Sequence, residues 1–287
     1  MKFGQVEHPE AVDFTLPPDA PQTKAILEKN KTNAPFEVYI GCAKWNRSDL
    51  KGFYPRGTKD ELTYYATQFN SIELNATFYG MPKWEQVETW REKTPDGFKF
   101  FPKVSDLITH YRRLNNVDEP IATFSNAVSN FQEKLGMAFL QLHDNFKPKD
   151  FAKLDAALRM FPQGFPLAVE VRNAEWFAPD NLDRFCNLLE ELQMANIVVD
   201  TAGRRDMLHM RLTGPEAFVR YVGANHPTDV DRLDDWIERI EKWRAEGLQK
   251  LYFFVHQNIE LESPLLAGHF IKKMNEKFGL SLTIPAR

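Results

Sequence analysis

Short runs of β-branched and aromatic residues alternate along the chain with segments whose apolar residues recur at helical spacing. Eight runs are predicted to be strands: Val38–Gly41, Ser71–Thr77, Phe98–Val104, Met137–His143, Leu167–Arg172, Ile197–Asp200, Leu208–Leu212 and Leu251–Gln257. The segments between most of them are typical of amphipathic helices; Leu182, Phe185, Leu188 and Leu192 illustrate the spacing. Repeated strand-helix alternation predicts an α/β fold, a TIM-type (β/α)8 barrel.

A doubly wound open sheet would show the same alternation of strands and helices. That fold places a Gly-rich phosphate-binding turn after its first strand. The residues at that point, Gly41–Trp45, read GCAKW and do not form such a turn. The barrel is therefore the preferred interpretation, and no cofactor is expected.

One connection is too short for a regular barrel. Only about seven residues, 201–207, separate the sixth predicted strand from the seventh, which leaves no room for a crossover helix. Seven extended residues span about 23 Å, whereas a five-residue strand is about 17 Å long. We therefore expect an irregular barrel with a short helix-free link between strands 6 and 7, and a surface loop over residues 214–229.

The first 35 residues differ from the rest of the chain because they are polar and rich in proline. Val12, Phe14 and Leu16 alternate with polar residues, so residues 1–35 are predicted to form an extended arm that packs on the barrel. Residues 36–287 are predicted to form a single TIM-like barrel domain, since barrels of this length occur as one unit.

Composition narrows the class of protein. Hydrophobic residues make up 43% of the chain, enough for a sizeable core. A net charge of -4 lacks the basic excess typical of nucleic-acid-binding proteins. Two cysteines cannot make a disulfide framework, and no apolar run approaches the roughly 20 residues of a membrane span. We expect a cytoplasmic protein that does not enter a membrane.

Polar residues recur at the carboxyl ends of the predicted strands, on the face opposite to the aliphatic residues. Glu73 and Asn75 alternate with Ile72 and Leu74 in this way. The other strand-end polar residues are Lys103, Gln141, His143, Glu170, Arg172, Asp200, His209, Arg211, His256 and Asn258. Charges inside strands are costly unless they are paired, and a barrel brings these strand ends to one face. A charged site is therefore predicted there.

Several segments resemble the DUF72 (YecE-like) family. They are Gly41–Trp45, Phe53–Pro55, Ile72–Gly80 (IELNATFYG) with Pro82, Thr109–His110, Leu140–Leu142, Ala168–Asn173 (AVEVRN), Trp176–Phe177 and Val199–Asp200. The resemblance implies a TIM-barrel-like fold with a polar cavity at the carboxyl ends of the strands and no established reaction. The matching positions are Trp45, Tyr54, Glu73, Asn75, Phe78, Tyr79, Lys103, His110, Gln141, Glu170, Arg172, Trp176, Asp200, Arg211, Gly214 and Asn258. The chain departs from the family pattern at Thr213, where a histidine is usual, and at residues 255–258.

These residues together predict an enzyme that acts by general acid/base chemistry on a small polar or anionic metabolite, which is phosphorylated, carboxylated or sugar-like. The reaction would be of the lyase, isomerase or hydrolase type. The predicted catalytic residues are Glu73, Lys103, His110, Glu170 and Asp200. The predicted substrate-binding residues are Trp45, Asn75, Tyr79, Gln141, Arg172, Trp176, Arg211 and Asn258.

Four alternatives remain open at this stage. The strand-end charges could be a structural ion-pair network that plugs the barrel. Glu73, Glu170 and Asp200 with a histidine could hold a metal, but the interleaved Lys and Arg residues argue against it, so no metal is expected. The aromatic residues and arginines could bind single-stranded nucleic acid in a repair-associated protein, which the net charge disfavours. Finally, the barrel could be a ligand sensor without catalysis.

Overall fold

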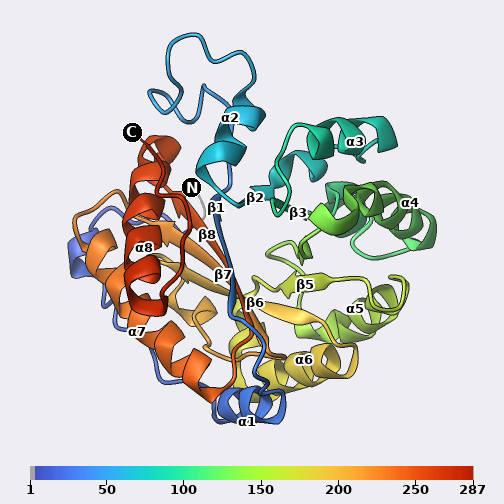
Figure 1. Ribbon diagram of the computed structural model, residues 1–287. Helices are drawn as coiled ribbons and strands as arrows, with labels where there is room; N and C mark the ends of the chain where they lie inside the picture. The colour runs from blue at the N-terminus through green and yellow to red at the C-terminus, as the bar shows by residue number, and fades with distance from the viewer. Residues whose placement is uncertain (1–3, 287) are drawn as a thin grey trace.

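Parallel strands curl into an irregular TIM-like barrel in this computed structural model, which describes residues 4–286 (Figure 1). The strands are β1 (Glu37–Cys42), β2 (Ser71–Leu74), β3 (Lys99–Pro102), β4 (Ala138–Gln141), β5 (Leu167–Glu170), β6 (Ala195–Thr201), β7 (Glu216–Gly223) and β8 (Lys250–Gln257). Six of them form one hydrogen-bonded sheet in the order β1-β8-β7-β6-β5-β4, and β2 pairs with β3 in a second sheet. The predicted fold class is confirmed.

Helices surround the strands (Figure 1). They are α1 (Pro21–Lys29), α2 (Glu61–Gln68), α3 (Trp84–Glu92), α4 (Asp118–Val128), α5 (Phe151–Leu158), α6 (Pro179–Glu191), α7 (Thr228–Glu246) and α8 (Ser263–Phe278). In α7, residues Leu233, Trp236, Ile240 and Trp243 are buried along one face, as expected of an amphipathic helix on a sheet. None of the helices within residues 4–286 combines the length and apolar character needed to cross a membrane.

The connection after β6 is irregular, but the prediction for the seventh strand is wrong. β7 comprises Glu216–Gly223 rather than residues 208–212, so it lies inside the predicted surface loop. The β6–β7 link contains no α-helix, only the short 3-10 helix η7 (Arg205–Met207). Residues 208–212 are not a strand because their backbone bonds to the N-terminal region. The Met210 carbonyl accepts from Ala20 N and Thr23 Oγ1, and Thr23 Oγ1 accepts from Leu212 N.

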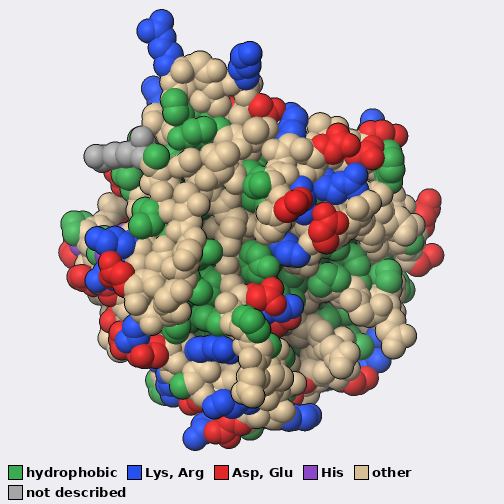
Figure 2. Space-filling view, in the orientation of Figure 1, with side chains coloured by type: hydrophobic (Ala, Val, Ile, Leu, Met, Phe, Trp, Pro, Cys, Tyr) green, Lys and Arg blue, Asp and Glu red, His purple; other side chains and the backbone are tan. Residues whose placement is uncertain are grey.

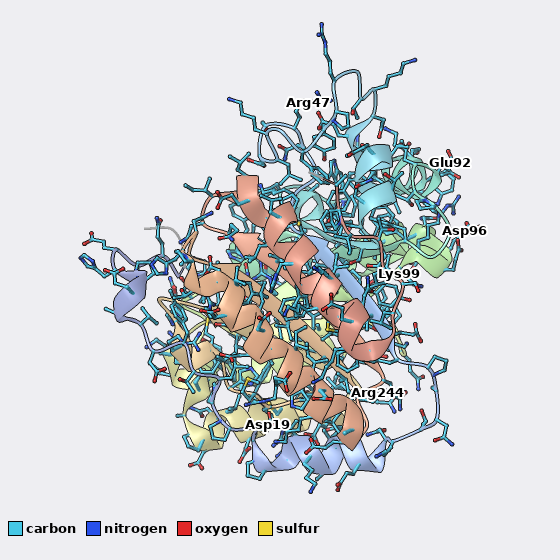
Figure 3. The ribbon with its side chains drawn as sticks, turned by 60° about the vertical axis from the view of Figure 1, so that its left-hand side comes forward. Asp19, Arg47, Glu92, Asp96, Lys99 and Arg244 are labelled. Carbon is cyan, nitrogen blue, oxygen red and sulfur yellow. The ribbon has the colours of Figure 1, made fainter. Side chains whose placement is uncertain are left out.

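Within residues 4–35, the described part of the N-terminal region, the backbone is not extended throughout. Residues 21–29 form helix α1, which begins at a proline as helices often do. The extended part before it is held to α7 through Asp19, which accepts from Arg239, Lys242 and Trp243. Asp19 lies at the end of α7 that also carries Arg244, and α8 runs alongside α7 (Figure 3).

Side chains join β1 to β2, which share no strand ladder. Ile40 N donates to Asn70 Oδ1 (3.0 Å), and Cys42 N donates to the Tyr65 hydroxyl (2.8 Å). That hydroxyl in turn donates to the Ser71 carbonyl (3.1 Å). A Cβ on Gly41 would lie 2.2 Å from the Ser71 carbonyl oxygen, so only glycine permits this approach. We call this contact the β1–β2 seam.

The barrel interior is filled by apolar side chains below a polar layer. Phe101, Phe139, Phe218 and Phe254 belong to one interior cluster. Two residues further along the same strands, and so on the same face, come Lys103, Gln141, Arg220 and His256. The interior is therefore apolar at its centre and charged at the carboxyl ends of the strands.

The outer surface carries mixed charge. On the face drawn in Figure 2, Lys and Arg side chains are interspersed with Asp and Glu side chains. The segment between β1 and α2, which includes Arg47, projects from the rest of the molecule (Figures 1 and 3). No broad basic field covers this face.

Candidate active site

A buried cluster of charged side chains lies at the carboxyl ends of β2, β5, β7 and β8. Arg220 of β7 is at its centre. Its Nε and one Nη donate to both oxygens of Glu73 at 2.9 Å, and its other Nη donates to Glu170 at 2.6 Å. This two-pronged contact with Glu73 is the arrangement in which an arginine binds a carboxylate most strongly. Arg220 thus links carboxylates from two different strands.

Further polar side chains bond to the same carboxylates. His256 Nε2 lies 2.9 Å from Glu73 Oε2, and Asn75 donates to Glu73 Oε1 at 2.9 Å. Arg172 Nε and Gln141 Nε2 donate to Glu170 Oε1, at 2.6 and 2.7 Å. We call Glu73, Glu170, Arg172, Arg220 and His256 the charged cluster. Its two carboxylates are fully buried and each accepts several bonds.

The electrostatics of the cluster keep both carboxylates ionised. Burial alone raises the pKa of a carboxyl group, but the adjacent cations reverse the effect here. Arg220 and His256 hold the pKa of Glu73 well below its usual range, and Arg220 and Arg172 lower the pKa of Glu170 to about 2. Burial lowers the pKa of His256, yet the carboxylates of Glu73 and, 3.6 Å from Nδ1, Glu260 overcome this and raise it to about 9. His256 is therefore a cation at neutral pH.

A pH-dependent contribution to stability follows from His256. Its folded-state pKa of about 9 lies above the ordinary value of 6.5, so its stabilisation is complete below pH 6.5 and is lost as pH rises through 9. Relative to His256→Gln, the wild type is expected to be more stable by about 1 to 3 kcal/mol at pH 6. Urea unfolding of both proteins at pH 6 and pH 9.5 measures this difference. A difference that does not shrink at the higher pH would contradict the assignment.

Lys103 lies in the same polar layer but makes a different set of contacts. Its side chain is 8% exposed, and its Nζ lies 4.1 Å from the Phe78 ring centre and 5.9 Å from that of Phe139. Within residues 4–286 its amine has no hydrogen bond or ion pair. Burial, with Arg220 and Arg172 nearby, lowers the pKa of Lys103 to about 7. Much of this amine is therefore neutral at physiological pH.

His110 lies close to Lys103, on the π-helix η3 (Leu107–Tyr111). Its Nδ1 is 2.8 Å from Thr109 Oγ1, and its ring contacts those of Phe78 and His143 at centre distances of 4.9 and 5.1 Å. Burial, His143 and Lys103 lower the pKa of His110 to about 4. His110 is a neutral imidazole at pH 7, able to accept and return a proton.

The structure brings together most of the site residues predicted from sequence. Glu73, Asn75, Gln141, Glu170 and Arg172 bond within the cluster, and Lys103 and His110 lie beside it. Tyr79 is next to Phe78, its ring 76% exposed to solvent.

Asp200 was predicted to point into the barrel, and this is wrong. Its neighbour Val199 belongs to the interior cluster, so Asp200 faces outward because side chains alternate along a strand. There it accepts hydrogen bonds from Arg232 and Trp236 of α7, each at 2.8 Å, and pairs with Arg205. Its role in the structure is to hold α7 and the β6–β7 link against the sheet.

Arg211 does not reach the site either, because the strand predicted to carry it does not exist. Its carbonyl accepts from the Asn196 side chain near the start of β6, at 2.6 Å. Its guanidinium bonds to Glu190 near the end of α6. Arg211 therefore lies toward the amino ends of the strands, opposite to the charged cluster.

Three other predicted ligand contacts lie outside the cluster. Trp176 is fully buried, and its indole donates to the Phe146 carbonyl (2.8 Å), so it offers no open stacking face. Trp45 packs edge-on against Trp90 of α3, at 5.9 Å between ring centres. Asn258 follows β8 and donates its backbone N–H to Gly223.

Arg220 was missed by the sequence analysis, although β7 carries a usable signal. Phe218, Arg220 and Val222 alternate with Val219 and Tyr221, the same pattern that identified Glu73 and Glu170. Among the described residues, no group of three or more His, Cys, Asp or Glu side chains is placed to hold a metal ion. Arg220 occupies the space between the carboxylates.

Comparison with known proteins finds a matching family model and similar bacterial proteins. A family model described as "Protein of unknown function DUF72" matches residues 39–286. The UPF0759 protein YecE of Escherichia coli (strain K12) is 27% identical over 252 residues, which cover 80% of this chain and 89% of that protein. The UPF0759 protein YunF of Bacillus subtilis is 28% identical over 152 residues, covering 50% of this chain and 53% of that protein.

Solved structures of two family proteins share the fold. A DUF72 family protein from Enterococcus faecalis V583 superposes with a TM-score of 0.68 at 20% identity, covering 86% of this chain and 99% of that chain. A DUF72 family protein from Thermotoga maritima MSB8 superposes with a TM-score of 0.65 at 24% identity, covering 84% of this chain and 99% of that chain. These likenesses agree with the barrel-like fold described above.

Proposed function

This chain belongs to the DUF72 family of proteins of unknown function, and from that premise we propose that it is an enzyme that binds a small anionic metabolite and acts on it by proton transfer. The metabolite carries a carboxylate or a phosphate. Lys103 and His110 are the groups proposed to exchange protons with it.

The observation that carries this proposal is the placement of two neutral bases beside a fixed positive charge. At neutral pH three cations, Arg172, Arg220 and His256, face three carboxylates, Glu73, Glu170 and Glu260, the last of which lies 3.6 Å from His256 Nδ1. These charges balance, so an anion is attracted to the Arg172 guanidinium rather than to the cluster as a whole. Glu73 and Glu170 are too acidic to donate protons near pH 7, so we assign them the role of holding the cations in place.

Lys103 is suited to proton transfer because of its pKa. A general base works best when its pKa lies near the operating pH. Lys103, with a pKa of about 7, meets this condition, whereas His110, with a pKa of about 4, is a weaker base; we assign it the role of a neutral ring that relays a proton. Arg172 retains 17% exposure of its side chain and is the member of the cluster best placed to contact an anion from the mouth.

Thermal unfolding in the presence of candidate ligands tests anion binding. The panel contains inorganic phosphate, sugar phosphates, small carboxylates and short oligonucleotides. A ligand at 100 times its dissociation constant adds about 2.7 kcal/mol, which raises the midpoint by about 5 to 10 °C in a protein of this size. We expect a shift with at least one small anion in the wild type and a much smaller one in Arg172→Met.

The matched control is Arg159→Met, which changes an exposed arginine on the outer surface and should keep the full shift. Wild-type shifts with oligonucleotides alone, or equal shifts in both variants, would argue against a small-anion site at Arg172. Product analysis of the stabilising compound by mass spectrometry then separates an enzyme from a sensor, since a sensor leaves the compound unchanged.

A further inference from the structure

We infer that Lys103 is a nucleophile that forms a Schiff base with the aldehyde or ketone group of the substrate. The inference rests on the proposed function, because it gives the anionic metabolite a second feature, a carbonyl group. It follows from the contacts that the Lys103 amine makes and from those that it lacks.

The amine is buried without a polar partner. The nearest carboxylates, Glu73 and Glu170, are already bonded by Arg220, Arg172 and His256. What faces Lys103 Nζ instead is the Phe78 ring at 4.1 Å. The Phe78 ring offers a cation–π contact, but burial and the neighbouring guanidinium groups of Arg220 and Arg172 outweigh it and favour the neutral, nucleophilic amine.

A second buried lysine shows that burial alone does not produce this state. Lys134 is 6% exposed, yet its Nζ donates to the carbonyls of Arg91 and Thr94 at 2.9 and 2.6 Å, near the end of α3. Lys134 is thus bonded as a structural lysine. Lys103 differs because its amine donates no such hydrogen bonds within residues 4–286 and lies near the cations Arg220 and Arg172, and burial beside another cation is the environment that activates amines for imine formation.

The chemistry balances with the groups present. The neutral Nζ attacks the carbonyl carbon, a C–N bond forms, and the carbonyl electron pair moves to oxygen. His110 accepts a proton from Nζ and returns one to that oxygen, which gives the carbinolamine. Protonation of its hydroxyl and loss of water then leave the protonated imine, so the net step consumes one proton and releases one water. The anionic group of the substrate contacts Arg172 throughout.

Reductive trapping of the wild-type protein tests the inference. The protein is incubated at pH 7 with sodium cyanoborohydride and one of three probes, and each lysine is then assayed for the adduct by peptide mass spectrometry. The probes are glyoxylate, dihydroxyacetone phosphate and the uncharged propionaldehyde. An amine of pKa about 7 has a neutral fraction roughly a thousandfold larger than an amine of pKa 10.5. We expect Lys103 to be modified at least tenfold faster than Lys134 and the exposed Lys24.

Two controls define the outcomes. Lys103→Arg should lose the fast adduct while labelling at Lys24 stays the same, and its thermal midpoint reports whether it has folded. The Lys103 rate in the wild type should level off above pH 7. Labelling of Lys103 no faster than Lys24 with any probe would overturn the inference.

The same experiment separates this inference from the proposed function. Lys103 could react as fast with propionaldehyde as with the two anionic probes, with rates that Arg172→Met does not change. That result would support Lys103 as a nucleophile and contradict an anion-binding site at Arg172. If small anions stabilise the wild type through Arg172 but none of the probes labels Lys103 preferentially, the result supports the anion-binding site and contradicts Schiff-base formation.

Discussion

Replacing Arg220 with methionine is expected to lower the free energy of unfolding by about 3 to 5 kcal/mol, the largest effect predicted for a single side chain of this protein. Arg220 makes three charge-assisted hydrogen bonds to Glu73 and Glu170. Its removal leaves the buried carboxylates of Glu73 and Glu170 without the cation that they share. Urea unfolding at pH 7 measures the loss.

Arg159→Met is the matched control for this prediction. Arg159 also contacts two carboxylates, Asp155 and Glu191, but on the exposed surface, where ion pairs contribute at most about 1 kcal/mol. A second variant tests the mechanism: adding Glu170→Gln to Arg220→Met should recover part of the loss, since it removes one unpaired charge. A loss in Arg220→Met no larger than that in Arg159→Met would show that the cluster does not hold the barrel together.

Replacing Lys103 with methionine is expected to raise the free energy of unfolding, the opposite of the effect at Arg220. The variant should be more stable than the wild type at pH 7 by about 1 to 3 kcal/mol, because methionine removes a buried amine that lies near Arg220 and Arg172, and this outweighs the lost cation–π contact with Phe78. Lys103 has a folded-state pKa of about 7 against an ordinary 10.5. Its cost is therefore greatest below pH 7 and disappears above pH 10.5.

Unfolding of Lys103→Met and wild type at pH 6 and pH 9.5 measures this prediction, and the gain should shrink at the higher pH. Lys134→Met is the control, since it loses two hydrogen bonds to carbonyls and should be destabilised at both values. If Lys103→Met is also destabilised, Lys103 has a structural role, and its assignment as a reactive group is wrong. A stabilised variant that no longer reacts with carbonyl compounds is the behaviour of a functional residue.

The alternation of side chains along strands was enough to locate half of the site from sequence. It worked for Glu73, Gln141 and Glu170 because polar residues interrupt short apolar runs there, on one face only. It failed at β6, where the polar residue lies on the helix-facing side; every residue of β6 is buried, as in β2, β4 and β5, so burial does not mark the difference. Where both faces of a parallel strand are covered, alternation does not distinguish the interior from the helix-facing side. The Asp200 side chain points toward the helices because Trp236 and Arg232 donate to it, and these residues lie more than 30 positions further along the chain.

The error at the seventh strand has a different cause. Residues 208–212 and 216–223 both alternate, and both lie in a short interval of the chain. The first segment is bonded by Thr23 of the N-terminal region, so its backbone is not available to the sheet. That pairing joins residues that are far apart in sequence. Trp176 illustrates the same limit, since its packing against Phe146 decides that it is buried.

The charged cluster also connects the two sheets of the barrel near the β1–β2 seam. Glu73 belongs to the two-stranded sheet, whereas Arg220 and His256 belong to the six-stranded sheet. Their hydrogen bonds brace the β1–β2 side, where the strand ladder is interrupted, whereas on the other side β3 and β4 are joined by backbone hydrogen bonds from Gly136 N to Phe100 and from Val104 N to Phe139. Closure of the barrel and assembly of the site are thus one cooperative event, and any force that parts the two sheets also takes the site apart.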